Sequence, residues 1–325
     1  MSQGWGSQIR HKSRDYAQRA IAYLCCFSIF YAYTVGPVYA QSPPSDPGII
    51  VDPESDVGFR PAIWYNANDP TPVIDITTPQ NGVSLNQYEQ FDVDENGVVL
   101  NNSQQQGVSA LAGSLRANPN LQGLAAEVII NEVTSGNVSN LSGAIEVFGQ
   151  SADVIVANPN GVMANGTSFI NTNRATLTTG VPVVGADGSV NLQVRDGKVA
   201  IGRDGIDGSG ASDLQIAGRT VTVDGRVTAN NSLIVSGGAQ DFNPLTGEAT
   251  AASSSSAAGS SFAIDGSAYG VMEAGRIKIT GNEAGLGVRA LGNLSSGQGG
   301  TDIICLLYTS PSPRDQRGSR MPSSA

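Results

Sequence analysis

The chain has 325 residues and a formal net charge of −10, and residues 41–304 alone carry 11 basic and 26 acidic side chains, a net charge of −15. Nucleic-acid binding requires clustered basic residues, so this composition argues against a partner with a phosphate backbone, and an anionic membrane would repel it. We therefore expect no nucleic-acid partner and attribute the acidity to the solubility of the chain.

Residues 1–40 are predicted to be a secretion signal of the extended type. A basic segment precedes an apolar run over residues 20–35, and Gly36-Pro37 ends that run. Val38 and Ala40 occupy the −3 and −1 positions of a cleavage site after residue 40. A membrane anchor is the alternative, but the run is short for a span of about 20 residues and contains polar side chains.

Residues 41–71 are rich in proline and aspartate. This composition predicts an extended leader or linker in front of the folded part of the chain. Trp64 is the large apolar side chain of the segment, and we expect it to pack onto the domain that follows.

Residues 72–304 predict an all-β domain. Short runs of valine, isoleucine, leucine and threonine alternate with glycine, asparagine, aspartate and serine. Only residues 106–117 show a doubtful helical spacing. We favour a parallel β-helix over a sandwich or a barrel, because short strands, frequent Gly and Asn corners and few aromatic residues fit stacked coils. No strict repeat is visible, which predicts imperfect coils with insertions such as residues 249–268.

Two similar turns stand out within this domain. They are Asn118-Pro119-Asn120-Leu121 and Asn158-Pro159-Asn160-Gly161. Proline fixes φ at about −65°, the preceding asparagine caps the turn, and the following Asn or Gly tolerates a left-handed conformation. The residues alone therefore predict two β-turn corners, and a recognition role is the second interpretation.

The surroundings of the two turns resemble the secretion domain of the filamentous haemagglutinin family. The resemblance is strongest over residues 117–180, extends to residues 78–103 and 273–289, and covers roughly residues 72–289. The paired Asn-Pro-Asn motifs at this separation are its most specific feature. Members of the family are large exoproteins exported by two-partner secretion.

The resemblance implies a right-handed parallel β-helix with extra strands capping its N-terminal end. It also implies an export address that is read in the periplasm by the POTRA domains of an outer-membrane β-barrel transporter, and that nucleates folding at the cell surface. Carried over by motif, the secretion-relevant positions are the eight residues of the two turns. Whether these residues contact the transporter or only shape the fold stays open.

The same resemblance places the fragment at the N-terminus of a secreted or surface-bound exoprotein, either an adhesin or haemagglutinin or a contact-dependent toxin carrier. A host-cell glycan or receptor is a further partner of such proteins. One departure from the family pattern is that Ala164 and Thr167 stand where many relatives carry a Cys-x-x-Cys pair, so no local disulfide is expected. Asn165-Gly166 between them is expected to make the tight turn unaided.

Catalytic chemistry has few candidates in this sequence. Residues 41–304 contain neither histidine nor cysteine, which excludes a Ser-His-Asp triad, a cysteine nucleophile and an ordinary zinc site. We expect no cofactor and no enzyme. The alternatives left open are a polysaccharide-acting β-helix enzyme using Asp204 and Asp207 or Asp92 and Asp94, and a calcium-binding turn at the first pair. A third alternative is a glycan-binding surface over residues 174–180 and 233–238.

Residues 305–325 do not match the texture of the preceding domain. The stretches CLLYTSPSPRD and SRMPSSA read, in order and in one frame, like a translated sequencing-library adapter, with residues 316–318 as its variable index. A native Pro/Ser-rich tail is the alternative. We expect that this segment is not native and that the natural chain continues beyond Ile304.

Overall fold

Three sheets wind around a common core in the computed structural model, which describes residues 48–67, 69–252 and 261–305. The predicted signal over residues 1–40 and residues 306–325 of the predicted adapter segment lie outside the described residues. No helix within the described ranges is long and apolar enough to cross a membrane.

Each sheet is one face of the coil, and the faces are named A, B and C here. Face A contains β1 (Ile49–Val51), β4 (Val83–Phe91), β8 (Val128–Val133), β11 (Ala152–Ala157), β14 (Thr172–Thr178), β19 (Ala211–Gly218), β22 (Ser232–Gly237), β27 (Arg276–Gly281) and β30 (Thr301–Cys305). Face B contains β2 (Ala62–Tyr65), β3 (Pro72–Asp75), β5 (Val98–Asn102), β10 (Ala144–Gly149), β13 (Thr167–Ile170), β18 (Ile206–Gly208), β21 (Arg226–Ala229), β26 (Val271–Ala274) and β29 (Leu294–Ser296). Face C contains β9 (Ser139–Leu141), β12 (Val162–Ala164), β17 (Lys198–Ile201), β20 (Thr220–Val223), β25 (Phe262–Gly266) and β28 (Gly287–Ala290).

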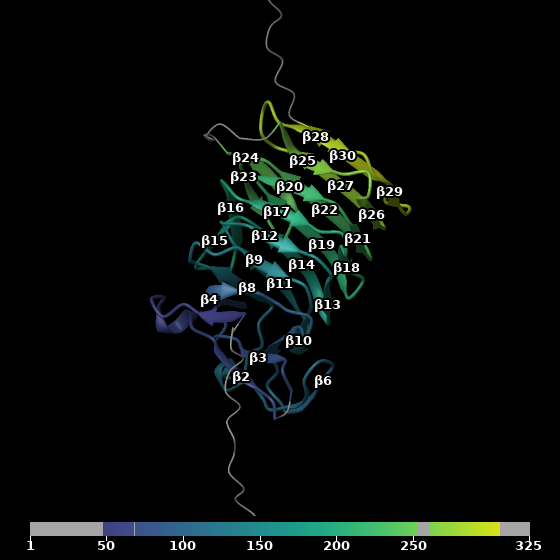
Figure 1. Cartoon of the computed structure of the whole chain (residues 1–325). Helices are drawn as coiled ribbons and strands as arrows, with labels where there is room; N and C mark the ends of the chain where they lie inside the picture. The colour runs from purple at the N-terminus through teal and green to yellow at the C-terminus, as the bar shows by residue number, and fades with distance from the viewer. Residues whose placement is uncertain (1–47, 68, 253–260, 306–325) are drawn as a thin grey trace, which may run out of the picture. The chain divides into compact units, whose positions relative to one another are not determined.

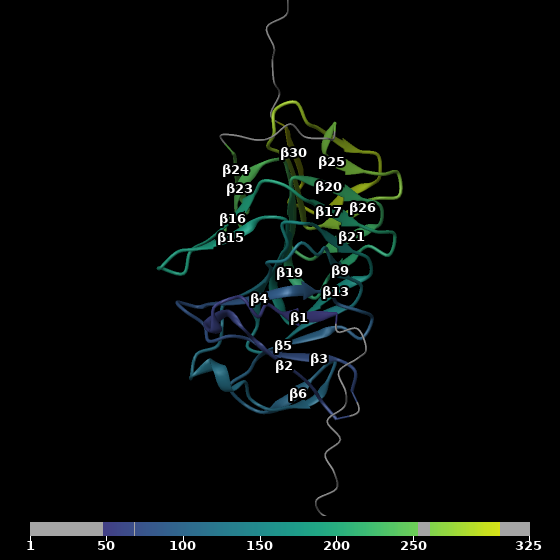
Figure 2. The same ribbon diagram turned by 60° about the vertical axis from the view of Figure 1, so that its left-hand side comes forward.

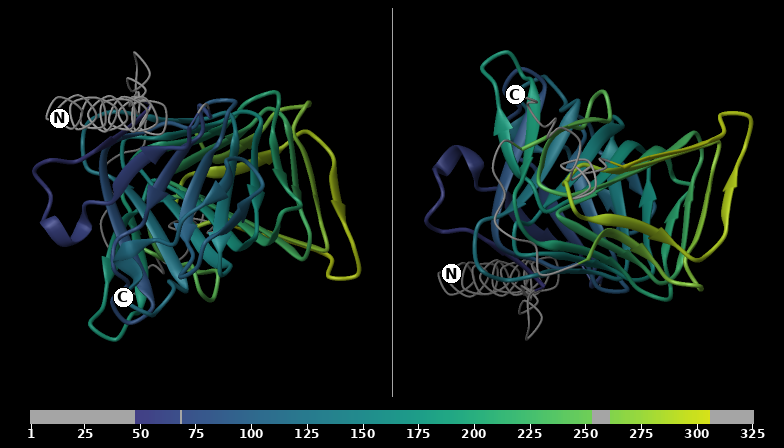
Figure 3. Two further views of the ribbon diagram at one scale, coloured as in Figure 1. Left: turned by 90° about the horizontal axis from the view of Figure 1, so that it is seen from below. Right: turned by 90° about the horizontal axis from the view of Figure 1, so that it is seen from above.

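The coil strands follow the fixed order A, C, B from β8 onward, and each of them except β9, the first strand of face C, pairs in parallel with the strand one turn earlier. This is the predicted parallel β-helix. Figures 1 and 2 show the strands of the coil stacked from the purple and blue N-terminal part of the chain to the yellow C-terminal part, and Figure 3 shows the same progression from below and from above.

Aligned aliphatic side chains fill the interior. Leu214 of β19 is in register with Leu233 of β22, which is in register with Ile277 of β27, and all three are fully buried. Burial of each such side chain contributes about 1.5–3 kcal/mol, so a continuous column of them stabilises the stack without large aromatic residues. Successive side chains of a strand point to opposite faces, so the alternation that predicted strands also places every second side chain in this column.

Two antiparallel strands cap the first turn of the coil. β1 pairs with β4 at the edge of face A, and β2 pairs with β3 at the edge of face B. Both capping strands lie within the segment predicted to be an extended leader, so residues 49–51 and 62–65 differ from that expectation. The reason is long-range pairing that local composition does not encode. Trp64 of β2 packs onto the domain as expected, against a buried cluster that includes Val73 and Phe148.

A fourth, antiparallel sheet lies outside the coil and is called the outer sheet here. Its strands are β15 (Val181–Val184), β16 (Val190–Val194), β23 (Gln240–Asn243) and β24 (Glu248–Ala251), in that order. Both hairpins are inserted at the corner between face A and face C. Leu192 and Phe242 of this sheet pack on Ile130 and Ile155 of face A, in a second buried cluster.

The insertion predicted over residues 249–268 is only partly a loop. Its first residues belong to β24 of the outer sheet, and residues 262–266 form β25 of face C. The intervening residues 253–260 lie outside the described residues. The repeat is therefore interrupted by ordered strands, as well as by a connecting segment.

The doubtful helical spacing of residues 106–117 is wrong as a prediction of structure. These residues form a hairpin of β6 (Gly107–Ser109) and β7 (Gly113–Leu115). The carboxylate of Glu146 accepts hydrogen bonds from the backbone amides of Ala110 and Leu111, at 2.8 and 2.9 Å, and from the Ser109 hydroxyl at 2.7 Å. The side chain of Glu146, distant in the sequence, thus binds backbone amides that would be paired within a helix.

Candidate functional site: the two Asn-Pro-Asn turns

The first turn lies at the corner where face B passes to face A. Residues Pro119–Leu121 form a short 3-10 segment, η2, between β7 and β8. The side-chain oxygen of Asn118 accepts the backbone amide of Asn120 at 2.9 Å. Its amide nitrogen donates to the carbonyl oxygens of Ile76, at 3.0 Å, and Asn101, at 2.8 Å. Asn118 therefore joins three stretches of chain and is 4% exposed.

The second turn lies at the corner where face A passes to face C, between β11 and β12. The side-chain oxygen of Asn158 accepts the backbone amide of Asn160 at 3.0 Å. Its amide nitrogen donates to the carbonyl oxygen of Asn137 at 2.9 Å and to the Ser139 hydroxyl at 3.0 Å. The Gly161 amide closes the turn on the Asn158 carbonyl at 3.0 Å.

The two turns share one design. In each, the first asparagine is buried, its oxygen caps the residue two positions later, and its amide group binds the preceding turn of the coil or the cap. Pro119 and Asn160 are exposed, whereas Leu121 and Gly161 are buried. The predicted capping by asparagine is confirmed, and most of each motif faces inward and shapes the corner.

The structure does not bring the two turns together. One precedes the strands of face A and the other follows them. A strand such as β8 has six residues, and at about 3.3 Å per residue the two corners are separated by roughly 20 Å. A partner that contacts both turns must therefore cover the whole width of face A.

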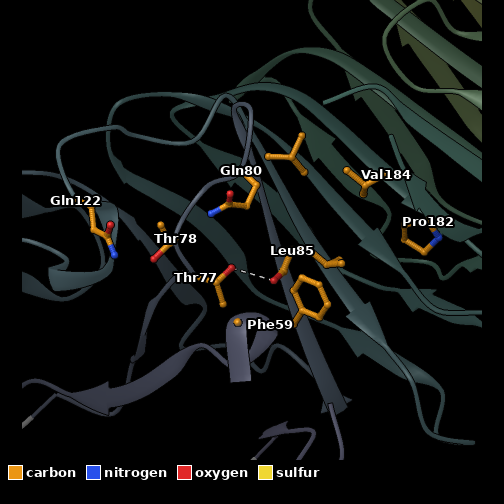
Figure 4. A pocket seen from close by; sticks show the side chains of 10 residues that line it. Phe59, Thr77, Thr78, Gln80, Leu85, Gln122, Pro182 and Val184 are labelled. Atoms are coloured by element: carbon orange, nitrogen blue, oxygen red, sulfur yellow. Dashed lines mark hydrogen bonds between the residues drawn. The ribbon is translucent and has the colours of Figure 1, made fainter. Parts of the chain in front are cut away.

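Beside the first turn lies a groove that the motif analysis missed (Figure 4). Its volume is about 690 Å³. Its lining residues are Gly58, Phe59, Thr77, Thr78, Gln80, Val83, Leu85, Gln122, Pro182 and Val184. Thr78 also donates its hydroxyl to the Asn120 carbonyl at 2.7 Å, so the turn and the groove share a wall. The run Val181-Pro182-Val183-Val184 was the available sequence signal, because an apolar strand containing proline is typical of a sheet edge.

The acidic pairs considered for catalysis are used in turns. Asp204 accepts a hydrogen bond from the Asn165 side chain at 2.6 Å, whereas Asp207 accepts from the Ser209 amide at 3.0 Å and the Thr228 hydroxyl at 3.1 Å. Hydrogen bonds from Ser209 hold the pKa of Asp207 below its ordinary value. The two carboxylates therefore have separate partners and are not poised as an acid and a base.

Asp92 and Asp94 likewise bind backbone amides, Asp92 across the coil and Asp94 within its own turn. Asp92 accepts the Asn140 amide at 2.6 Å and Asp94 accepts the Asn96 amide at 2.9 Å. Over the described ranges, no cluster of three or more His, Cys, Asp or Glu side chains is placed to hold a metal ion.

The surface considered for glycan binding is covered. Thr176, Thr178 and Thr179 of residues 174–180, and Leu233 and Val235 of residues 233–238, are at most 1% exposed. Thr176 and Thr178 face outward from face A but lie beneath the outer sheet, whereas Leu233 and Val235 point into the core. These stretches therefore do not present a flat ligand surface.

The positions of the missing cysteine pair bracket a tight turn. Ala164 ends β12 and Thr167 begins β13, and both are fully buried. Gly166 has φ of 88°, and its amide donates to the Gly205 carbonyl at 2.9 Å. Ordinary backbone hydrogen bonds hold this corner, as expected from Asn165-Gly166.

Comparisons with known proteins agree on one group of relatives. Residues 51–304 match the TPS secretion domain. The chain is 41% identical over 233 residues to filamentous hemagglutinin of Bordetella pertussis, which covers 69% of this chain and 6% of that protein. It is 39% identical over 262 residues to the tRNA nuclease CdiA of Escherichia coli (strain STEC_O31), covering 79% of this chain and 8% of that protein. The crystal structure of a filamentous hemagglutinin secretion domain superimposes with a TM-score of 0.70 and 33% identity, over 81% of this chain and 98% of that one.

Proposed function

The chain belongs to the family of TPS (two-partner secretion) domains, and from this premise we propose that it is recognised in the periplasm by a dedicated outer-membrane transporter. In this proposal the POTRA domains of a β-barrel transporter read the folded or folding domain before it crosses the outer membrane. The coil then provides the first rungs on which the rest of the exported protein folds at the cell surface. The extent of the match, residues 51–304, is the observation that carries the proposal.

The eight residues of the two turns are proposed as secretion determinants that act mainly by shaping the domain. The buried amides of Asn118 and Asn158 support this role, since each joins neighbouring turns of the coil through its side chain. The exposed members Pro119 and Asn160 are the positions through which direct contact with the transporter is available.

The whole protein is proposed to be a large exoprotein of the adhesin or toxin-carrier type, released or held at the outer surface. The chain spans 6 to 8% of the length of the relatives compared here, filamentous hemagglutinin and the tRNA nuclease CdiA. The nuclease name belongs to a protein of which only this small share is matched. We therefore assign no catalysis to this domain, and binding of a host glycan or receptor would belong to the remainder of the protein.

The proposal is tested by export with and without the partner. Residues 1–304 are expressed in a Gram-negative host, alone and together with the transporter encoded beside the native gene, and the culture medium is assayed. Release into the medium is expected only with the transporter. Asn158→Ala and Pro159→Ala should reduce that release, while removal of the signal segment proceeds normally.

Retention of the folded domain in the periplasm, both with and without the transporter, would contradict the proposal. The control for folding is resistance of the periplasmic domain to a protease, measured with and without the transporter. Detectable cleavage of an acidic polysaccharide by the purified domain would instead favour the enzymatic alternative, which the separate partners of Asp204 and Asp207 do not support.

A further inference from the structure

The outer sheet does not extend over the whole of face A. Its edge strand is β15, which lies against β8, whereas face A continues beyond β8 to β4 and β1. The outward-facing side chains of β4, Val83 and the half-buried Leu85, therefore form the floor of the groove seen in Figure 4, with Pro182 and Val184 of β15 along one side.

The backbone of β15 is ready to accept a further strand. β15 and β16 are antiparallel, with Val183 opposite Asn191. The Gly185 amide donates to the Ser189 carbonyl at 2.8 Å, so by alternation residues 183 and 181 direct their backbone groups toward β16. Pro182 and Val184 therefore direct theirs to the free edge. Proline has no amide hydrogen to lose there, as expected for an edge position.

The groove is closed at one end and joined to the first Asn-Pro-Asn turn at its side. The side-chain amide of Asn81 donates to the Ala186 carbonyl at 2.8 Å, which ties the tip of the β15–β16 hairpin to the start of β4. Gln122, which follows that turn in a left-handed conformation with φ of 47°, lines the groove together with Thr78. The turn thus helps to fix the shape of the groove.

We infer that this groove receives an extended strand of the transporter's periplasmic domain, which pairs with the outer edge of β15 and places apolar side chains on Val83, Leu85 and Phe59. The inference rests on the proposed function. Because the outer sheet is antiparallel throughout, the incoming strand runs antiparallel to β15. Strand addition of this kind draws affinity from main-chain hydrogen bonds and specificity from alternate side chains.

Charge favours the transporter over a second copy of this chain as the occupant. Residues 41–304 carry a net charge of −15, and a second copy would bring the same charge to the contact. Near the groove in the sequence, Asp56 and Asp187 are exposed two and three residues from the lining residues Gly58 and Val184, and Arg60 is exposed beside Phe59, so acidic side chains outnumber the basic one. The matching strand is therefore apolar on the face toward the groove and flanked by basic residues.

Val184 and Val183 provide a matched pair of variants for the test. They are neighbours in one strand and are 37% and 44% exposed, but only Val184 lines the groove. Binding of the chain, purified from the periplasm, to the isolated periplasmic domain of the transporter encoded beside the native gene is measured by biolayer interferometry. Val184→Asn should weaken binding at least about tenfold, whereas Val183→Asn should change it by less than about twofold, since only the first buries an unpaired amide.

The outcomes separate this inference from the proposed function. If the unaltered chain does not bind the periplasmic domain, the proposed function fails. If the unaltered chain binds and both variants bind equally well, the groove inference fails and recognition lies elsewhere on the domain. Melting temperatures close to that of the unaltered chain establish that both variants are folded.

Cross-linking gives a second measurement that does not depend on weakened affinity. Residues 41–304 contain no cysteine, so Val184→Cys and Val183→Cys, each made with Cys305→Ser, introduce one labelling site in the mature domain. A short photoreactive maleimide at position 184 should cross-link to the transporter domain far more efficiently than the same label at position 183. Equal yields, or a cross-link to a second copy or to the chain's own residues in place of the transporter domain, would overturn the inference.

Discussion

Arg219 and Glu283 form a buried, bidentate ion pair that spans three consecutive turns of the coil. Nη2 of Arg219 lies 2.8 Å from Oε1 of Glu283, and Nε lies 3.2 Å from Oε2. Arg219 follows β19 and Glu283 follows β27, so the corner after β22 lies between them. Gly238 at that corner leaves the necessary room, since a Cβ there would approach the Glu283 amide nitrogen to 2.7 Å. The ion pair therefore fastens the corner between faces A and C.

Arg219→Met should lower the free energy of unfolding by about 3–5 kcal/mol, because it leaves the Glu283 carboxylate buried without its counter-charge. The measurement is chemical denaturation followed by circular dichroism. The Glu283 carboxylate also accepts a hydrogen bond from the Ala239 backbone amide at 3.0 Å. In the double variant Arg219→Met/Glu283→Gln, the side-chain oxygen of the new glutamine can still accept this hydrogen bond. The double variant should recover much of the loss. A single variant that costs less than about 1 kcal/mol would contradict this account.

Asn158→Ala should lower the free energy of unfolding by about 2–4 kcal/mol, because it removes four side-chain hydrogen bonds of a fully buried residue and leaves the buried Ser139 hydroxyl without this partner. Asn118→Ala removes the same arrangement and should cost a similar amount. Asn160→Ala is the control, since its side chain is exposed and the expected cost is below about 1 kcal/mol. Equal losses for Asn158 and Asn160 would show that burial of the first asparagine is unimportant.

Gly161→Ala should cost about 1–3 kcal/mol through backbone strain, because Gly161 has φ of 137°. An added Cβ would also lie 3.2 Å from the Lys198 carbonyl oxygen of the adjacent turn. Gly136→Ala is a suitable control at an exposed site where an added Cβ meets nothing within 4 Å, and its expected effect is within about 0.5 kcal/mol. The melting temperatures of the two variants are compared. A loss of stability in Gly161→Ala alone indicates strain, whereas equal losses indicate that alanine is poorly tolerated at either position.

Glu132→Gln should raise the melting temperature at about pH 7 and have little effect at about pH 4. Burial raises the pKa of Glu132 above its ordinary value, although the Gln87 side chain, which donates at 2.8 Å, opposes the shift. The folded state therefore binds the proton more tightly than the unfolded state. The stabilising contribution of the protonated carboxyl is complete below the ordinary glutamate pKa and is lost as pH rises through the raised value.

The control for this pH dependence is Glu127→Gln, which alters an exposed carboxylate just before the same strand. Melting curves of both variants and the unaltered chain are compared from about pH 4 to pH 7. A stability gain of Glu132→Gln that is the same at every pH would refute the titration argument and point to packing instead.

The fold was largely predictable because the coil repeats a local pattern. Alternation in stretches such as Thr220–Val223 correctly predicted strands, and the shortness of the strands correctly predicted a parallel β-helix. The outer sheet was not predictable from the same signal. Val190–Val194 has the spacing of a coil strand, and only its pairing with β15 and β23 places it outside the coil. Alternation specifies a strand but does not specify its neighbours.

The two turns were found from the sequence, but their buried orientation was not. The carbonyl oxygens that bind Asn118 and Asn158 come from residues 76, 101 and 137, which only the stacking of the coil brings to the corners. The groove was not predicted from the sequence for a related reason. Phe59, Val83 and Val184 are far apart in the sequence, and each resembles an ordinary apolar residue of a β-protein. Local rules predict corners well and surfaces assembled from distant segments poorly.

The antiparallel caps give the coil a direction of growth. β1 occupies the free edge of β4, and β2 occupies the free edge of β3, so the first turn offers no parallel edge on faces A and B. A new turn can be added only at the opposite end, as in a polymer with one blocked terminus. For a chain delivered N-terminus first, each turn then forms on a finished template and pairs with a neighbouring stretch of sequence. Elongation of this kind requires little search of conformational space, however long the polymer becomes.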